Sequence, residues 1–537
     1  MTANRRQLAV AVALSAIILA AAFTRFYRLG EPDQCYFDEQ YFPTTGAEIL
    51  RGDNAAWDFY GHENTHPPLS KELMAAGMAI FGHQDRAGVD NHCWPDEPDS
   101  FKRVDPNWIY EPFGWRFFGA LAGVGAVVFI YLVAKKLFHS EVAGLTAAFL
   151  LTFEGLAFVQ SRIATPDTYV LFFLLGAVYF LLSDRLSVFR LALSGVFFGA
   201  ALASKWIAAL MIVPISLYLI WTLVRRLRET ERDERLWVIE GVILISLAVV
   251  AAGFALVALA LLVTGDVYFD LLIVSATGML TVFGALIPVA VSSELRNSQR
   301  GRLYLNVALV VPLCFVLAPL AVYALTYIPL LESGHGVSYA LDLNKSAYEF
   351  HSSLEAKHSY QSSFLEWPII ARPIFVHGSG YAKIYSMGNP IIFWAGIPAL
   401  VFVLWHALRH VRATLDEATG ALSISGGFTK GDAPLLFVAL SYLGFWLPFA
   451  INPRALFLYH YLPALVFLLL SLAYGVQWLW HREEAWGRIL AIAFLALVAV
   501  TFAYFYPHMA SVEVSKSLDD SYYWFDGTIL DFIFDWS

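Results

Sequence analysis

The stretch FGWRFFGALAGVGAVVFIYLVA, residues 113–134, is apolar or aromatic throughout except for one charged side chain, Arg116. A run of roughly 20 such residues is long enough to cross the hydrocarbon core of a bilayer as an α-helix. Similar runs fill much of the chain, near residues 7–23, 142–160, 167–183, 189–204, 206–224, 237–263, 267–291, 304–328, 390–408, 433–451, 456–480 and 487–506. The sequence therefore predicts an all-α polytopic membrane protein with about 13 transmembrane helices.

The composition supports this fold class and excludes others. The 537 residues are 58% hydrophobic and 15% charged, whereas an ordinary soluble domain is about 25% charged. The same figures exclude a disordered chain, which lacks apolar surface to bury. A net charge of -9 makes nucleic acid an unsuitable partner, so we expect none.

The first apolar run follows Arg5 and Arg6 and has the length of a signal peptide. No small-residue cleavage pattern precedes Phe26 and Tyr27, so we expect the run to be retained as the first helix.

Positive charges predict the orientation of the helices, because short loops rich in Lys and Arg stay on the cytoplasmic side. Alternate loops carry them: Arg5/Arg6, Lys135/Lys136, Arg185/Arg190, the cluster 225–235, Arg296/Arg300/Arg302, Arg409/Arg412 and Arg482/Arg488. We therefore expect a cytoplasmic N-terminus. A transmembrane domain over 1–506 would then place outside the cell two polar segments, 24–112 and 329–389, and a C-terminal tail, 507–537.

Two of the three cysteines, Cys35 and Cys93, lie in the first outer segment, where a disulfide could form in an oxidising compartment. Two unrelated buried thiols remain the alternative. Cys314 is expected to serve helix packing.

Two adjacent carboxylates, Asp38 and Glu39, stand in the aromatic sequence CYFDEQYF, residues 35–42. A carboxylate in a partly dry pocket can take a proton from an alcohol. Asp38 could instead only cap the following helix. The sequence alone leaves both interpretations open.

The motif His66-Pro-Pro-Leu-Ser-Lys71 leads into an apolar stretch with helical spacing. A histidine and a lysine at a membrane surface could hold an anionic group. The alternative is a plain helix entry with a solvated lysine.

Basic residues at the outer ends of spans depart from the positive-inside pattern: Arg116, Arg162, Lys205 and Arg454. A charge within a span usually faces a cavity and marks function, and the arginine fork suits phosphate. For Lys205 and Arg454, snorkelling to the interface is an alternative. Arg162 could reach a ligand or pair with Asp167.

No metal-binding, Walker or dinucleotide motif is present, and we expect neither a metal nor a cofactor.

The order of the motifs resembles that of the protein O-mannosyltransferases, glycosyltransferase family 39, from about residue 25 to 465. The motifs are Phe37-Asp-Glu, His66-Pro-Pro-Leu-Ser-Lys71, Gln160-Ser-Arg-Ile with Asp167, Ser359 to Pro368, Gly388-Asn-Pro390 and Leu458-Tyr-His-Tyr-Leu-Pro463. The resemblance implies a GT-C fold with short amphipathic helices in the first outer loop. It also implies a polyprenyl (dolichyl-type) phosphate mannose donor and Ser or Thr acceptors on exported polypeptides.

By this resemblance Asp38 is the catalytic base, Glu39 is its neighbour in the site, and Arg116 meets the donor phosphate. Arg162 and Lys205 are expected near the same phosphate. Substrate binding or shaping of the site is expected of His66, Lys71, Asp167, Trp367, Asn389, Arg454 and His460. A single inverting displacement would turn a β-linked donor mannose into an α-linked product.

Two features depart from the family pattern. The lysine motif reads Leu-Ser-Lys where Leu-Gly-Lys is usual, and the MIR domain of eukaryotic members is absent, which favours a prokaryotic protein in the plasma membrane. Similarity to aminoarabinose transferases, which also carry an early Asp-Glu pair, is the nearest alternative; their acceptor would be a glycan or lipid. A transporter is a further alternative, but the chain shows no repeated halves.

Overall fold

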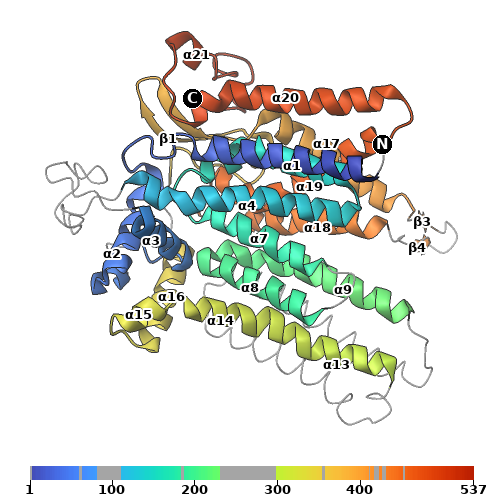
Figure 1. The fold of residues 1–537 in the computed structure, drawn as a ribbon, viewed down its shortest axis with the longest axis horizontal. Helices are drawn as coiled ribbons and strands as arrows, with labels where there is room; N and C mark the ends of the chain where they lie inside the picture. Colours follow the sequence, from blue (N-terminus) through green and yellow to red (C-terminus); the bar gives the residue numbers. More distant parts are fainter. Residues whose placement is uncertain are drawn as a thin grey trace.

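A computed structural model describes residues 3–59, 63–81, 111–182, 187–229, 298–353, 357–410, 412–415, 422–425, 431–451 and 454–536. Long helices lie side by side, and short elements gather at the end of the bundle that carries α2, α3 and α16 (Figure 1). The long elements are α1 (Ala3–Phe26), α4 (Pro112–Phe138), α5 (Glu141–Thr152), α7 (Asp167–Leu181), α8 (Val188–Ser204), α9 (Ile212–Glu229), α13 (Gln299–Pro312), α14 (Ala318–Leu325), α17 (Pro390–Leu408), α18 (Asp432–Trp446), α19 (Leu462–Trp480) and α20 (Ala485–Met509).

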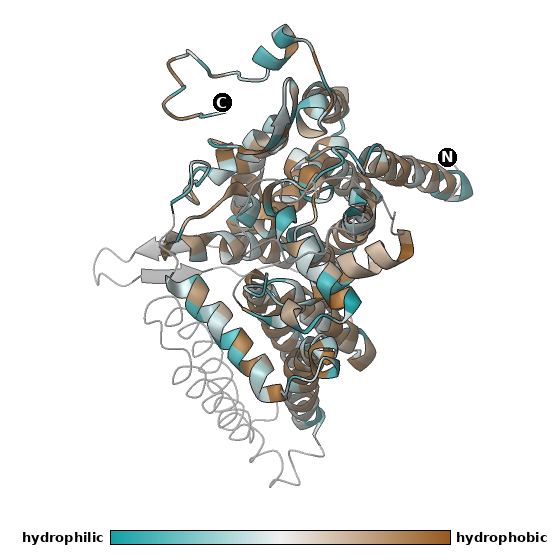
Figure 2. Ribbon diagram, turned by 90° about the vertical axis from the view of Figure 1, so that its left-hand side faces the viewer, coloured by the Kyte–Doolittle hydropathy of each residue, from teal (hydrophilic) through white to brown (hydrophobic). Residues whose placement is uncertain are grey.

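Within the described residues, seven helices are long and apolar enough to cross a membrane: Asn4–Phe26, Pro112–Phe138, Trp206–Arg226, Pro390–Leu408, Asp432–Ile451, Leu458–Trp480 and Ala485–Met509. Shorter apolar helices lie between them, and the hydrophobic colouring continues along most of the bundle (Figure 2). The all-α polytopic prediction is confirmed. The expected spans near 237–263 and 267–291 lie outside the described residues, so the count of 13 stays a prediction.

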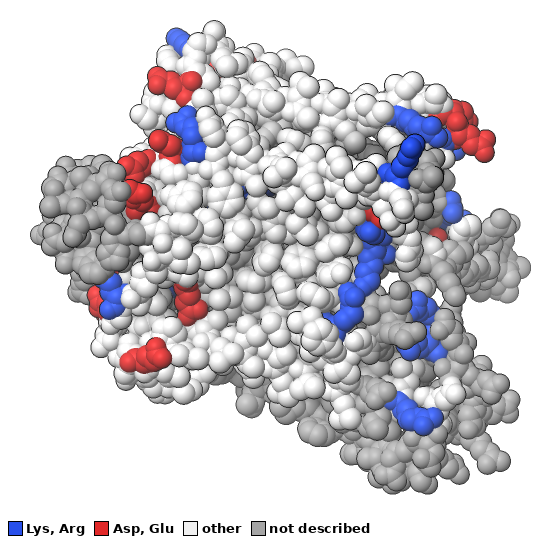
Figure 3. All heavy atoms as spheres, viewed as in Figure 1, with Lys and Arg blue, Asp and Glu red and all other residues white. Residues whose placement is uncertain are grey.

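Charged side chains on the visible face gather at the two ends of the bundle, and the band between them is nearly free of charge (Figure 3). Such a band is what contact with lipid hydrocarbon requires, because a charge there is costly. The chain is therefore a multi-pass membrane protein.

The apolar run 142–160 is not one helix, as the sequence predicted, but two. It breaks between α5 and α6 (Gly155–Gln160) at the fully buried Glu154. The Glu154 carboxylate accepts hydrogen bonds from the backbone N–H groups of Leu156 (3.0 Å) and Ala157 (2.6 Å). It therefore caps the new helix, and hydropathy alone cannot show such a break.

The first outer segment forms short helices, as expected: η1 (Phe37–Gln40), α2 (Phe42–Arg51), η2 (Asn54–Trp57) and α3 (Leu69–Phe81). Phe42 of α2 packs with Met74 and Met78 of α3 against Trp115 of α4. This packing fixes the short helices onto the N-terminal end of α4, a membrane-spanning helix.

The second outer segment contains α15 (Ile328–Glu332), α16 (Val337–Ser353), η6 (Trp367–Ile369) and an antiparallel hairpin of β1 (Ile374–Ser379) and β2 (Ala382–Ser386). A second small hairpin pairs β3 (Arg412–Leu415) with β4 (Leu422–Ser425) at the opposite end of the bundle. The C-terminal tail, with α21 (Lys516–Asp520), docks on the first hairpin through an ion pair from Lys383 to Asp519 (2.7 Å). Trp536 is buried and donates a hydrogen bond to the carbonyl of Ile370 (2.7 Å).

Helix α8 packs closely against the chain from η5 (Leu313–Leu317) to α14. A Cβ atom on Gly195 would lie 1.6 Å from the carbonyl oxygen of Cys314, and one on Gly199 would lie 2.7 Å from the Cα of Pro319. These glycines are required because backbone, not a flexible side chain, occupies the space.

We therefore predict that Gly195→Ala forces these helices apart and costs about 1–3 kcal/mol of stability. Thermal unfolding in detergent measures the effect. The matched control is Gly475→Ala in α19, where a Cβ meets nothing within 4 Å and helix propensity improves. Equal unfolding temperatures for the two variants would contradict this close packing.

Candidate active site

Asp38 lies in the 3-10 turn η1, directly before α2, partly buried, with Glu39 beside it. Burial raises the pKa of Asp38 to about 7; nearby Lys205 opposes the shift, while Asp167 and Glu63 add to it. Within the described part of the chain, no hydrogen bond or ion pair reaches this carboxylate. Asp38 is thus a carboxylate that can exchange a proton near neutral pH.

Glu39 has a different environment. It is fully buried, and its two oxygens accept hydrogen bonds from Nε (2.8 Å) and Nη2 (2.7 Å) of Arg116. The backbone N–H of Ala164 donates a third bond (2.9 Å). The two adjacent carboxylates therefore differ in role. Glu39 is held in an ion pair, whereas Asp38 has no ionic partner among the described residues.

Arg116 uses its remaining N–H groups on backbone carbonyls. Nη1 donates to Leu29 and Pro32 (3.1 Å each), and Nη2 donates to Gln34 (2.9 Å). Every N–H of the guanidinium group thus has an acceptor inside the protein. These contacts tie residues 29–39 to α4, and they do not favour the expected contact with phosphate.

Arg162 likewise binds backbone. It donates to the carbonyls of Thr24, Arg25, Tyr27 and Arg28 at 2.8–3.1 Å. Thr24 and Arg25 lie in the last turn of α1, where carbonyl groups have no partner within the helix. Arg162 therefore caps α1, and the suggested pairing with Asp167 was wrong.

The partner of Asp167 is Lys205. Lys205 Nζ lies 3.0 and 2.9 Å from the two carboxylate oxygens and 4.9 Å from the ring centre of Tyr459. Asp167 begins α7 and Lys205 directly follows α8, so tight packing of these two helices creates the pair. Both charges act on Asp38.

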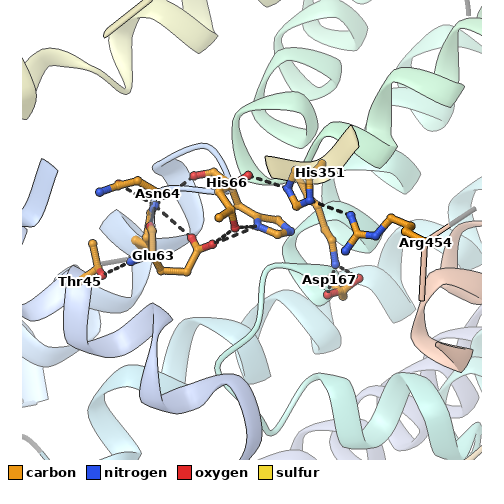
Figure 4. A network of polar contacts seen from close by, with 10 residues as sticks. Thr45, Glu63, Asn64, His66, Asp167, His351 and Arg454 are labelled. Atoms are coloured by element: carbon orange, nitrogen blue, oxygen red, sulfur yellow. Dashed lines mark hydrogen bonds and ion pairs between the residues drawn. The ribbon is translucent and has the colours of Figure 1, made fainter. Parts of the chain in front are cut away.

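The His66 motif folds into a network with Glu63 (Figure 4). The Glu63 carboxylate lies 3.1 Å from His66 Nδ1 and 3.3 Å from Lys71 Nζ. Burial would raise the pKa of Glu63, but Lys71 and His66 hold it below its usual value. Lys71 is fully buried and also donates to the carbonyl of His66 (3.0 Å), so the solvated-lysine alternative was wrong.

The residues of the distal motifs make contacts within the protein. Trp367 is buried, donates to Ser362 Oγ (3.0 Å) and stacks on the His460 ring with 6.1 Å between ring centres. Asn389 caps α17 and donates to the carbonyls of Phe153 and Val498 (3.0 Å each). Arg454 Nη1 donates to Nδ1 of His351 (2.7 Å).

Neither Glu63 nor His351 is among the site residues predicted from the sequence. Their partners lie in loops, and the local sequence does not predict where those loops run in the fold. Cys35 is disulfide-bonded and Cys314 is a free buried thiol, while Cys93 lies outside the described residues. No three His, Cys, Asp or Glu side chains within the described ranges form a metal-binding group.

The fold is that of GT-C membrane glycosyltransferases. It superposes on the S. cerevisiae protein O-mannosyltransferase Pmt1-Pmt2 complex bound to the sugar donor with a TM-score of 0.66, over 98% of this chain and 92% of that chain, at 13% identity. Family models match residues 15–329 ("Dolichyl-phosphate-mannose-protein mannosyltransferase") and 337–527 ("C-terminal four TMM region of protein-O-mannosyltransferase"). The chain belongs to the protein O-mannosyltransferase family.

Curated relatives span nearly the whole chain. The polyprenol-phosphate-mannose--protein mannosyltransferase of Mycobacterium tuberculosis is 24% identical over 93% of this chain and 88% of its own length. The protein of the same name in Mycolicibacterium smegmatis is 24% identical over 94% and 90%.

We predict that Glu39→Gln costs about 3–5 kcal/mol, because it leaves the Arg116 charge buried without a counter-charge. Asp38→Asn removes no ionic partner of a described residue, and its stability should stay near that of the wild type. Thermal unfolding of the purified variants in detergent compares them. If an Arg116→Ala variant unfolds like the wild type but loses donor binding, Arg116 binds the donor phosphate, as the sequence predicted.

Proposed function

We propose that this protein transfers mannose from a polyprenyl (dolichyl-type) phosphate mannose donor to Ser or Thr hydroxyls of exported polypeptides. Family membership and the activity for which the mycobacterial relatives are named support this substrate class. The observation that carries it is Asp38, a carboxylate with a pKa of about 7 beside the Lys205–Asp167 pair.

Asp38 is the general base of the proposal. A base works best when its pKa lies near the operating pH, because it is then both unprotonated and able to hold the proton. In the transfer, the acceptor hydroxyl oxygen forms the bond to the anomeric carbon, and its proton passes to Asp38. The bond from that carbon to the phosphate oxygen breaks on the opposite face, which inverts the β-linked sugar to an α-linked product.

Negative charge grows on the departing phosphate, and a fixed cation beside it lowers the barrier. Lys205 is the cation we assign to this role, since its charge already acts on the Asp38 pocket. Arg116 and Arg162 instead hold η1 and α1 in place through the contacts described above. A carboxylate base and a cation suffice for such a displacement, so no step is assigned to a metal or cofactor.

We further propose that the Asp38 end of the bundle faces outward from a prokaryotic plasma membrane, with the N-terminus in the cytoplasm. The N-terminus lies at the opposite end from η1, α2 and α3 (Figure 1). On the face seen in Figure 3, Lys and Arg predominate at that N-terminal end, as the positive-inside rule requires. Membrane lipids then bring the donor to the outer end of the helices.

The direct test incubates the purified protein in lipid with radiolabelled polyprenyl phosphate mannose and a Ser/Thr-rich peptide. We expect transfer by the wild type and a loss of roughly 100- to 10,000-fold in Asp38→Asn, because the base is removed. Donor binding should be retained.

Normal turnover in Asp38→Asn would overturn the base assignment. Label that leaves the donor without reaching peptide would point to a glycan or lipid acceptor, as in the aminoarabinose-type alternative. No release of label would overturn the donor assignment.

The transfer rate should also depend on pH. Because Asp38 must be unprotonated to accept the hydroxyl proton, the rate at saturating donor should rise as pH increases from about 6 to 8 and level off above the pKa. Glu63 should not mask this step, since Lys71 and His66 hold its pKa below the usual value. A flat profile across this range would contradict a base of pKa about 7.

A further inference from the structure

Helix α16 lies across the first outer loop and presents one face to it. Tyr339, Leu343, Ala347 and His351 are spaced four residues apart, so their side chains share one stripe of the helix. The Tyr339 hydroxyl donates to the carbonyl of Trp57 (3.1 Å), and Leu343 packs in the cluster around Trp57. Ala347 lines a small hollow that His66 and Trp206 also line.

His351 completes the stripe and makes two directional bonds. Its Nε2 donates to the carbonyl of Thr65 (2.8 Å), and its Nδ1 accepts from Arg454 Nη1 (2.7 Å). Because an arginine cannot accept and a carbonyl cannot donate, these partners assign the proton to Nε2. Burial, together with His66 and Arg454, lowers the pKa of His351 to about 3, so the ring stays neutral at physiological pH.

The two bonds join parts of the chain that lie far apart in sequence. Thr65 stands between Glu63 and His66 in the network of the first outer loop. Arg454 precedes η8 (Leu458–Tyr461), which carries Tyr459 and His460. The Tyr459 ring lies 6.5 Å from that of Phe37, next to Asp38, and Lys205 lies over the same ring.

We propose that His351 is a positioning residue, which holds the Arg454 guanidinium at the site as a second cation for the anionic headgroup of the lipid donor. Figure 4 shows Arg454 pointing toward His351, on the side of the network where Asp167 lies. The proposal rests on the proposed function for the identity of the donor. A neutral acceptor suits this role, because a protonated His351 would repel the arginine.

Two substitutions of His351 distinguish its hydrogen bond to Thr65 from its hydrogen bond to Arg454. In His351→Asn, the amide oxygen can take the place of Nδ1 and keep the bond to Arg454, while the bond to Thr65 is lost. In His351→Gln, the longer amide reaches the place of Nε2 and keeps the bond to Thr65, while the bond to Arg454 is lost. The exposed Glu349 on the other face of α16 gives a control, Glu349→Gln.

We expect His351→Gln to weaken donor binding by roughly tenfold or more, since it removes a hydrogen bond to a charged group. The rise should be in KM for the donor, with kcat little changed. His351→Asn and Glu349→Gln should bind the donor within about twofold of the wild type, a difference below one hydrogen bond. Arg454→Gln should reproduce His351→Gln, and the double variant should add little, because both act through one contact.

Binding of polyprenyl phosphate alone, titrated against each purified variant, tests the inference without any sugar transfer. Failure of transfer in the wild type would therefore count against the proposed function and not against His351. Equal weakening in His351→Asn and His351→Gln, or none in His351→Gln and Arg454→Gln, would overturn the proposal. If His351→Gln does not fold, Arg454→Gln and His351→Asn still decide it.

Discussion

The buried ion pair between Arg116 and Glu39 is the constraint on which the Asp38 end of the bundle depends. Two charges removed from water are tolerated only when each is fully hydrogen-bonded, and here every N–H of the arginine has an acceptor. That requirement fixes the loop that leaves α1, the turn η1 and the start of α4 relative to one another. This arrangement also fixes the position of Asp38, because Asp38 directly precedes Glu39 in the same turn.

The four basic residues predicted at the ends of spans divide into two kinds. Arg116 and Arg162 each donate to several backbone carbonyl oxygens, and the forked guanidinium group is suited to binding several at once. Lys205 instead binds the side chain of Asp167, whose charge acts on Asp38, and Arg454 binds the side chain of His351. In the sequence all four are simply cations at the ends of apolar runs. Only the fold distinguishes those that build the site from those that face it.

Features with a local signal could be predicted from the sequence. Runs of apolar residues gave the membrane-spanning helices, and the order of motifs indicated Asp38 and the short helices that carry it. Features that depend on distant partners could not. The helix break at Glu154 depends on a carboxylate that caps a buried helix end. The pairing of Asp167 depends on the packing of α7 against α8. The contacts of Glu63 and His351 form only where the two long polar segments of the chain meet.

The position of Asp38 at the end of the bundle opposite the N-terminus has a physiological consequence. With the orientation proposed above, this carboxylate exchanges protons with the medium outside the cell and is insulated from the buffered cytoplasm. The sugar coat of newly exported proteins would then be set by the habitat as well as by the supply of lipid donor. Acidification of that medium would then slow the mannosylation of exported proteins, without any change in gene expression.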